Sequence, residues 1–125
     1  MREIKFRAWH KKDKKMYEVI RMELDDNHGN MWVEVIRDGD YSCGMDEIEL
    51  MQYTGLPDME AKEMYELDIV ERGSYRGIIK WDDIEARFRI YCDRGQIGFV
   101  NYPIDPSWKV IGNIWEHPQL SNITK

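Results

Sequence analysis

Apolar and polar residues alternate along much of the N-terminal half of the chain, which is the pattern of β-strands that bury one face. The alternation begins at residues 3–9 and, after a polar turn at 11–15, resumes at 16–24. Turn-forming residues then lead to a β-branched and aromatic run at 31–36, and a further strand is expected at 48–53. These segments predict an N-terminal antiparallel β-meander.

The C-terminal half continues with short strands that are separated by turn residues. The expected strands cover residues 67–70, 75–81, 86–92, 97–100 and 108–115. A spacing of about 8–12 residues between strands is typical of a small β-barrel. The predicted fold class is therefore mainly β.

Between the two halves, residues 58–66 are rich in helix formers, and Asp58 stands where an N-cap would. We expect at most one short helix there. No repeat or low-complexity linker divides the chain, so we expect a single domain over residues 1–125. Its parts are an N-terminal β lobe over about 1–53, a junction over 54–66 and a barrel-like lobe over about 67–116.

With 42 % hydrophobic and 34 % charged residues, the composition is that of a globular protein, and no apolar run approaches the ~20 residues that span a bilayer. The charged N-terminus lacks the apolar core of a secretory signal. We therefore expect a cytoplasmic protein with no membrane contact. Cys43 and Cys92 lack CxxC spacing, which favours reduced, buried thiols over a disulfide or a zinc site.

The net charge of −6 is unevenly distributed. Residues 1–23 carry +4, residues 24–68 carry −11 and residues 69–125 carry +1. Such asymmetry can steer a partner or dock one subunit on another, although two solvated faces of one small protein explain it more simply.

Three segments of the sequence are distinctive. They are residues 2–9 (REIKFRAW) with 14–16 (KKM), residues 50–58 (LMQYTGLPD) with 62–70 (KEMYELDIV), and residues 110–118 (VIGNIWEHP). The middle segment is the most specific, because a QYTGL run shortly before an ExDIV run is hard to reach by chance. Together the segments resemble the YopX family of small phage and prophage proteins.

This resemblance implies a phage-encoded protein of a bacterial host, with an SH3-like barrel in its C-terminal part. It implies no assigned activity, and no catalytic residue or cofactor to carry over. The chain departs from the family pattern at Ala61 and Leu67, where glycine is usual. Ala61 is expected to make the turn after Asp58 more helical, because the access of glycine to positive φ is lost. Leu67 argues against a tight kink at the start of the C-terminal lobe.

An acidic stretch partly matches a calcium-binding loop. Its candidate ligands, at loop positions 1, 3, 5, 9 and 12, are Asp38, Asp40, Ser42, Asp46 and Glu49. Cys43 stands where the loop needs glycine, and both flanks are strands, so an acidic surface loop is favoured over a metal site.

No other residues form a recognisable catalytic motif. Asp82, Asp83 and Glu85 could hold Mg²⁺, but a solvated turn is favoured for them. The histidines lack metal-ligand spacing and are expected in exposed loops: His10, His28 and His117. We therefore expect neither an enzyme nor a cofactor.

Basic residues around the first turn, with an aromatic ring among them, suggest a surface for single-stranded nucleic acid. They are Arg7, Trp9, Lys11, Lys12, Lys14 and Lys15, with Arg87 and Arg89 as a second strip. The acidic middle segment opposes such a role by repelling a polyanion.

Tryptophan, tyrosine and methionine are numerous enough to supply a protein interface as well as a core. The candidate protein-binding residues are Trp32, Tyr53, Tyr65 and Trp115. Trp9, Trp32 and Trp115 lie on the opposite parity from their strands' main apolar faces, so they form either a second core layer or a contact surface. Free strand edges also favour a homo-oligomer.

The leading hypothesis is a non-enzymatic binding protein that contacts a phage or host protein, or a second copy of itself. The alternatives are an accessory protein that binds single-stranded nucleic acid and a small metal-dependent hydrolase.

Overall fold

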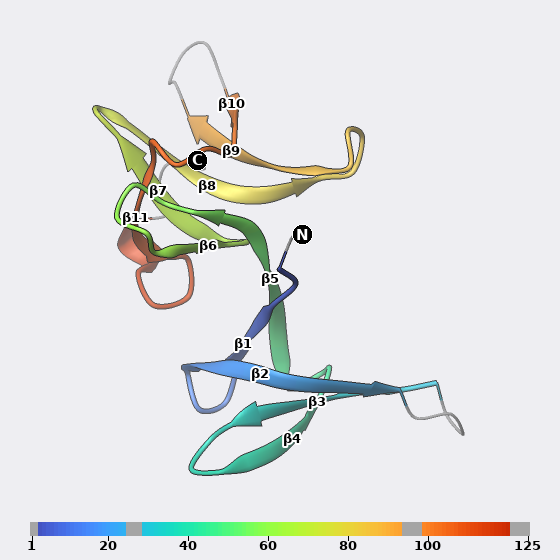
Figure 1. Ribbon diagram of the computed structural model, residues 1–125. Helices are drawn as coiled ribbons and strands as arrows, with labels where there is room; N and C mark the ends of the chain where they lie inside the picture. The colour runs from blue at the N-terminus through green and yellow to red at the C-terminus, as the bar shows by residue number, and fades with distance from the viewer. Residues whose placement is uncertain (1–2, 25–28, 94–98, 121–125) are drawn as a thin grey trace. The chain divides into compact units, whose positions relative to one another are not determined.

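A computed structural model describes residues 3–24, 29–93 and 99–120 (Figure 1). Regular structure in these residues is almost entirely β, in two antiparallel sheets, with a 3₁₀ turn at residues 118–120. The fold is therefore mainly β, as the alternation predicts. No helix among the described residues is long and apolar enough to cross a membrane. The expected turn at residues 25–28, with His28, and part of the strand at 97–100 lie outside the described residues.

The chain divides into two compact units, of which Ile4–Gln52 is the N-terminal one. Its strands are β1 (Phe6–His10), β2 (Lys15–Leu24), β3 (Met31–Ile36), β4 (Asp40–Gly44) and the first part of β5 (Ile48–Pro57). They pair in the antiparallel order β4-β3-β2-β1-β5, which is the expected meander with β5 returned to β1. The expected loop before Gly44 is wrong, because residues 40–44 pair along β3 as an edge strand.

A bend in β2 lets this sheet enclose a core. Residues 15–18 of β2 pair with β1, whereas residues 19–24 pair with β3, and the register shifts between Val19 and Arg21. A bulge at such a position bends a strand and lets its two halves belong to layers that cross at a large angle. The buried cluster drawn from both layers consists of Ala8, Val33, Val35, Cys43 and Ile48.

The second unit begins at Tyr53. Its strands are β6 (Glu63–Tyr65), β7 (Asp68–Arg72), β8 (Tyr75–Asp82), β9 (Arg87–Asp93), β10 (Phe99–Pro103) and β11 (Lys109–Asn113). β6 pairs with the end of β5, and the others form an antiparallel sheet in the order β10-β9-β8-β7-β11. The SH3-like barrel stays a prediction, because in the described part of the chain no pairing joins β10 to β11.

The short helix allowed at residues 58–66 does not form, because the Asp58 side chain holds this segment as a loop. One carboxylate oxygen, Oδ1, accepts hydrogen bonds from the N–H groups of Glu60 (2.8 Å) and Lys62 (2.9 Å). The other, Oδ2, accepts the N–H of Val110 (2.9 Å) in β11. The buried Asp58 carboxylate thus links the loop to β11 by hydrogen bonds and does not cap a helix.

The expectations for Ala61 and Leu67, which stand where the family usually has glycine, are wrong. Ala61 has φ of 65° and Leu67 has φ of 68°, so both keep the left-handed conformation that glycine adopts easily. The turn after Asp58 is therefore no more helical than a glycine would make it. The kink at Leu67 also remains, with the Leu67 N–H donating to the carbonyl of Ile79 (2.7 Å).

Replacing Ala61 with glycine should stabilise the protein by about 0.5–1 kcal/mol. A left-handed φ costs a non-glycine residue roughly 1–2 kcal/mol, and the extra freedom of glycine in the unfolded chain offsets only part of that gain. Ala61 is exposed, so no packing is lost. Denaturant unfolding measures the change. Ala86→Gly, at an exposed residue with φ of 55°, should act in the same direction, and lower stability in both variants would contradict the argument.

Candidate functional site

A polar hollow of about 440 Å³ opens beside the turn between β1 and β2 in the N-terminal unit. It is lined by His10, Lys11, Lys12, Asp13, Arg37, Tyr41, Asp46 and Glu47. The lining carries both signs of charge, which suits a small charged or metal ligand better than an apolar one.

His10 is the buried centre of this region, with only 4 % of its surface exposed. It is the last residue of β1, where it pairs with Lys15 of β2 and Ile48 of β5. Its Nδ1 accepts the N–H of Asp13 (3.0 Å), and its carbonyl accepts the N–H of Lys14 (2.8 Å) in the turn. The expected exposed loop histidine is therefore wrong, because His10 continues the core-facing parity of Phe6 and Ala8 on a strand with neighbours on both sides.

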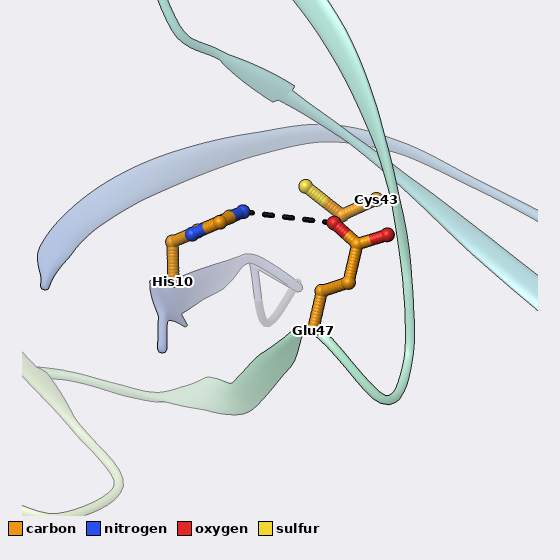
Figure 2. A group of neighbouring side chains, drawn as sticks. All are labelled: His10, Cys43 and Glu47. Carbon is orange, nitrogen blue, oxygen red and sulfur yellow. Dashed lines mark ion pairs between the residues drawn. The ribbon is translucent and has the colours of Figure 1, made fainter. Parts of the chain in front are cut away.

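The other ring nitrogen of His10, Nε2, is buried and has no hydrogen-bond partner. It points toward Glu47, whose Oε2 lies 3.6 Å away, with the thiol of Cys43 beside them (Figure 2). Ligand atoms of these three residues all lie within 4.8 Å of one another. In residues 3–24, 29–93 and 99–120, this is the one group of three or more His, Cys, Asp or Glu side chains with metal-binding geometry.

Hydrogen bonds from backbone N–H groups hold Glu47 beside His10. The N–H of Gly44 donates to Glu47 Oε1 (3.4 Å), and the N–H of Lys11 donates to the Glu47 carbonyl (3.0 Å). Burial raises the pKa of the Cys43 thiol, and the nearby Glu47 carboxylate raises it further. Cys43 is a buried free thiol, as the sequence predicts, and it is protonated at neutral pH, which is unsuited to a nucleophile.

Asp13 is held as a carboxylate on the other side of the His10 ring. The Tyr17 hydroxyl donates to Asp13 Oδ2 (2.8 Å), and Arg37 Nε lies 3.0 Å from the same oxygen. The hydrogen bond from Tyr17 lowers the pKa of Asp13, burial opposes this, and Arg37 lowers it further. The Arg37 guanidinium also lies over the Tyr41 ring, 4.4 Å from its centroid, so this wall of the hollow is well braced.

The calcium-loop candidates do not form a site. Asp38, Asp40, Asp46 and Glu49 are not gathered into a ligand group among the described residues. Asp38 occupies the β3–β4 turn with φ of 51°, and the Glu49 carboxylate lies 3.5 Å from the Lys11 ammonium. The acidic surface loop that the sequence favoured is wrong for Asp40, which lies on β4, and for Glu49, which lies on β5.

The carboxylates at the β8–β9 turn also serve the turn itself. Asp82 Oδ1 accepts the N–H groups of Ile84 (2.9 Å) and Glu85 (3.3 Å). Glu85 forms ion pairs with Arg87 and Arg89. These contacts place Asp82 and Glu85 in the turn that the sequence favoured.

The Trp9 ring is not available to the proposed nucleic-acid surface. Trp9 is buried in the core, so it cannot stack on a base, and the expected stacking role is wrong. The side chains of Lys12, Lys14 and Lys15 are exposed at the first turn. The remaining basic residues are half-buried or held by acidic and amide groups: Arg7, Lys11, Arg87 and Arg89.

The four protein-binding candidates divide according to burial. Tyr53 is buried and its ring packs 5.5 Å from that of Tyr65, so Tyr53 offers no surface and that prediction is wrong. Tyr65 and Trp115 are half-buried. Trp32 is 44 % exposed, which makes it the tryptophan of this set that is open to a partner.

A second hollow, of about 310 Å³, lies beside Trp32 in the N-terminal unit. Its lining residues are Asn30, Met31, Trp32, Gly44, Met45 and Asp46. Gly44 lies directly opposite Trp32 in the β3–β4 pair and has no side chain to cover the indole. We call this the Trp32 hollow. The sequence missed it because Gly44 and Met45 come from a segment expected to be a loop.

The strands that lead to the Trp32 hollow expose apolar side chains on their other face too. At the open ends of β2 and β3, Met22 pairs with Val33, and Leu24 pairs with Met31. Met22, Leu24 and Met31 are exposed. These ends run out as a two-stranded ribbon (Figure 1) that exposes these three side chains, whereas Val33 beside them is buried in the core.

The fold and hollows define a class of small, mainly β protein built from antiparallel meanders. The chain belongs to the YopX family: the family model described as YopX protein matches residues 5–121. A solved structure that resembles it is the crystal structure of protein EF1440 from Enterococcus faecalis. It is 22 % identical, with a TM-score of 0.63 over 96 % of this chain and 99 % of that one. No curated protein matched the chain.

Proposed function

We propose that this chain is a non-enzymatic accessory protein of a phage or prophage that acts in the bacterial cytoplasm by binding a protein partner. The contact surface is the Trp32 hollow together with the exposed end of the β2–β3 ribbon. The family supports the phage context, and the exposed apolar residues support the mode of action.

One observation carries this proposal, namely an exposed tryptophan beside a hollow that Met31 and Met45 flank. Tryptophan is among the residues that contribute most to binding energy at protein interfaces, and methionine adapts its shape to a partner. Covering such a surface removes apolar area from water, which favours association.

The lining also indicates what kind of partner fits. Asn30 and Asp46 add polar groups to the lining of the Trp32 hollow, and Gly44 contributes backbone alone. A large apolar side chain that enters the hollow would lie against the indole, with a donor or cation of the partner near Asp46. A protein segment with an exposed aliphatic or aromatic anchor therefore fits best.

Binding to single-stranded nucleic acid has less support, because Trp9 is buried and supplies no ring beside the exposed lysines of the first turn. Its distinguishing result would be a shift of labelled single-stranded DNA at low salt that Lys12→Glu and Lys14→Glu abolish.

Trp32→Gln should abolish capture of the partner, because it removes the ring that the anchor packs against. The tagged wild-type protein and its variants are used to capture proteins from phage-infected bacterial cells. Trp81→Gln is the matched control, since Trp81 is 45 % exposed and lies on β8 of the other unit. A protein retained by wild type and Trp81→Gln but lost with Trp32→Gln is the expected result.

The same bound proteins from all three samples would contradict the proposal. Light scattering after size-exclusion chromatography shows whether the partner is a second copy: wild type and Trp81→Gln would then be dimers and Trp32→Gln a monomer. Monomers throughout, combined with no Trp32-dependent capture, would overturn the proposed surface.

A further inference from the structure

We propose that His10, Cys43 and Glu47 bind a transition-metal ion of the Zn²⁺ type in the N-terminal unit. None of the three residues lines the Trp32 hollow, and the site does not depend on the proposed protein contact. Its ligands are the imidazole Nε2, the thiolate Sγ and a carboxylate oxygen, which point toward one another in Figure 2.

The first argument is the state of His10 itself. Its side chain is more than nine-tenths buried, and Nε2 has no hydrogen-bond partner while it points between Cys43 and Glu47. Buried polar atoms almost always have a partner, so one that lacks it demands an explanation. A metal ion bound at Nε2 provides one.

The second argument is the composition of the ligand set. Nitrogen, sulfur and oxygen donors together suit a borderline-soft divalent ion and not the hard ions Ca²⁺ and Mg²⁺. A thiolate and a carboxylate together balance the two positive charges of the ion, so the occupied site carries no excess charge. Both His10 and Glu47 line the 440 Å³ hollow, so a fourth ligand such as water can enter from solvent.

The present spacing is close to what the ion needs. The ligand atoms lie within 4.8 Å of one another, whereas metal bonds of about 2.0–2.3 Å place tetrahedral ligands about 3.3–3.8 Å apart. Glu47 Oε2 already lies 3.6 Å from His10 Nε2, within this range, so the adjustment that remains is in the distances to Cys43 Sγ.

Protons must be redistributed when the ion binds. Nδ1 now accepts the N–H of Asp13, which places the imidazole proton on Nε2. Binding moves that proton to Nδ1, so the hydrogen bond from the Asp13 N–H to Nδ1 breaks, and Asp13 Oδ2, now 3.6 Å from Nδ1, must move closer to accept the proton. A carboxylate that orients the second nitrogen of a histidine ligand is usual in metal sites. Cys43 releases its thiol proton to solvent, so one proton leaves for each ion bound.

Titration of the reduced full-length chain with Co²⁺ tests the site, because Co²⁺ replaces Zn²⁺ and reports its ligands through absorption. One equivalent should produce thiolate-to-cobalt charge transfer and tetrahedral visible bands, which Zn²⁺ then abolishes. Cys43→Ser should lose the charge-transfer band. Cys92→Ser is the matched control, since Cys92 is also a buried cysteine but lies on β9, and it should keep the band.

Glu47→Gln provides a variant that should fold, because its side chain is half-buried, and it should weaken binding about tenfold or more. Circular dichroism confirms folding of each variant. Absence of a Co²⁺ spectrum from wild type would overturn the proposal. So would a band that survives in folded Cys43→Ser or disappears in folded Cys92→Ser.

Discussion

Replacing Asp58 with alanine should destabilise the protein by about 3 kcal/mol. The substitution leaves three backbone N–H groups, those of Glu60, Lys62 and Val110, without their acceptor. Each buried donor that loses its partner costs about 1–3 kcal/mol, and Val110 is buried whereas the loop amides can reach water. The loop should then detach from β11.

Denaturant unfolding measures this loss. Asp58→Asn removes the charge but keeps the shape of the side chain. Its carbonyl oxygen can still accept the N–H groups of Glu60 and Lys62, whereas its NH₂ group cannot accept the N–H of Val110. It should therefore lose less than alanine does. Asp83→Asn, at an exposed position of the β8–β9 turn, should change stability by no more than about 0.5 kcal/mol. Equal effects at positions 58 and 83 would contradict the role assigned to Asp58.

The same carboxylate gives stability a pH dependence. Burial would raise the pKa of Asp58, but the N–H groups of Val110, Lys62 and Glu60 together outweigh it and hold the pKa below its ordinary value. A lowered folded pKa stabilises the protein above the unfolded value of about 3.9. This contribution is lost as the pH falls through the folded pKa, so the difference between wild type and Asp58→Ala should shrink in acid.

Gly77→Ala should cost about 2–3 kcal/mol. A Cβ at this position of β8 would lie 2.5 Å from Ile90 Cγ2, 2.8 Å from Cys92 Sγ and 2.9 Å from the carbonyl oxygen of Tyr91. The side chains of Ile90 and Cys92 are buried in the core of the second unit, and a backbone oxygen cannot rotate away. Overpacking of this kind typically costs 1–3 kcal/mol, and the strand pair must also separate.

Thermal and denaturant unfolding of Gly77→Ala test this close approach of β8 to β9. Ser74→Ala, at an exposed position of the β7–β8 turn three residues away, controls for a general sensitivity of this sheet and should be nearly neutral. Wild-type stability in Gly77→Ala would mean that β8 and β9 are farther apart than described.

Local sequence patterns, namely alternation at residues 3–9 and β-branched and aromatic residues at 31–36, were sufficient to predict several strands. The strand expected at residues 31–36 coincides with β3, and those around Phe6 and Tyr75 fall on β1 and β8. A period of two depends on each residue and its near neighbours, so it survives without knowledge of the partner strand. β4 was missed because it has only five residues and turn-forming residues stand on both sides of it. Its pairing with β3, which the sequence does not reveal, makes it a strand.

Long-range bonds explain where local propensity failed. Residues 58–66 contain good helix formers, but three hydrogen bonds to Asp58, one of them from β11, stabilise a loop instead. Similarly, Ala61 and Leu67 adopt left-handed conformations that neither residue prefers. The surrounding structure determines these backbone angles, and the sequence alone does not reveal that.

The candidate sites were harder to predict than the fold because each gathers residues from separate segments. His10, Cys43 and Glu47 belong to β1, β4 and the segment before β5, so no spacing rule connects them. The alternation of apolar and polar residues also could not show which of Trp9 and Trp32 is buried, because both lie on the face opposite the main apolar residues of their strands. Trp9 lies on a strand between β2 and β5 and is buried, whereas Trp32 faces Gly44 and stays open.

Site-specific photo-crosslinking tests the central claim, contact through the Trp32 hollow, most directly. Trp32 or Trp81 is replaced by p-benzoylphenylalanine, and the protein is irradiated in phage-infected bacterial cells. The account predicts a discrete protein adduct from position 32 that excess untagged wild type suppresses, and no such adduct from position 81. No adduct at position 32, or the same adduct from both positions, would contradict it.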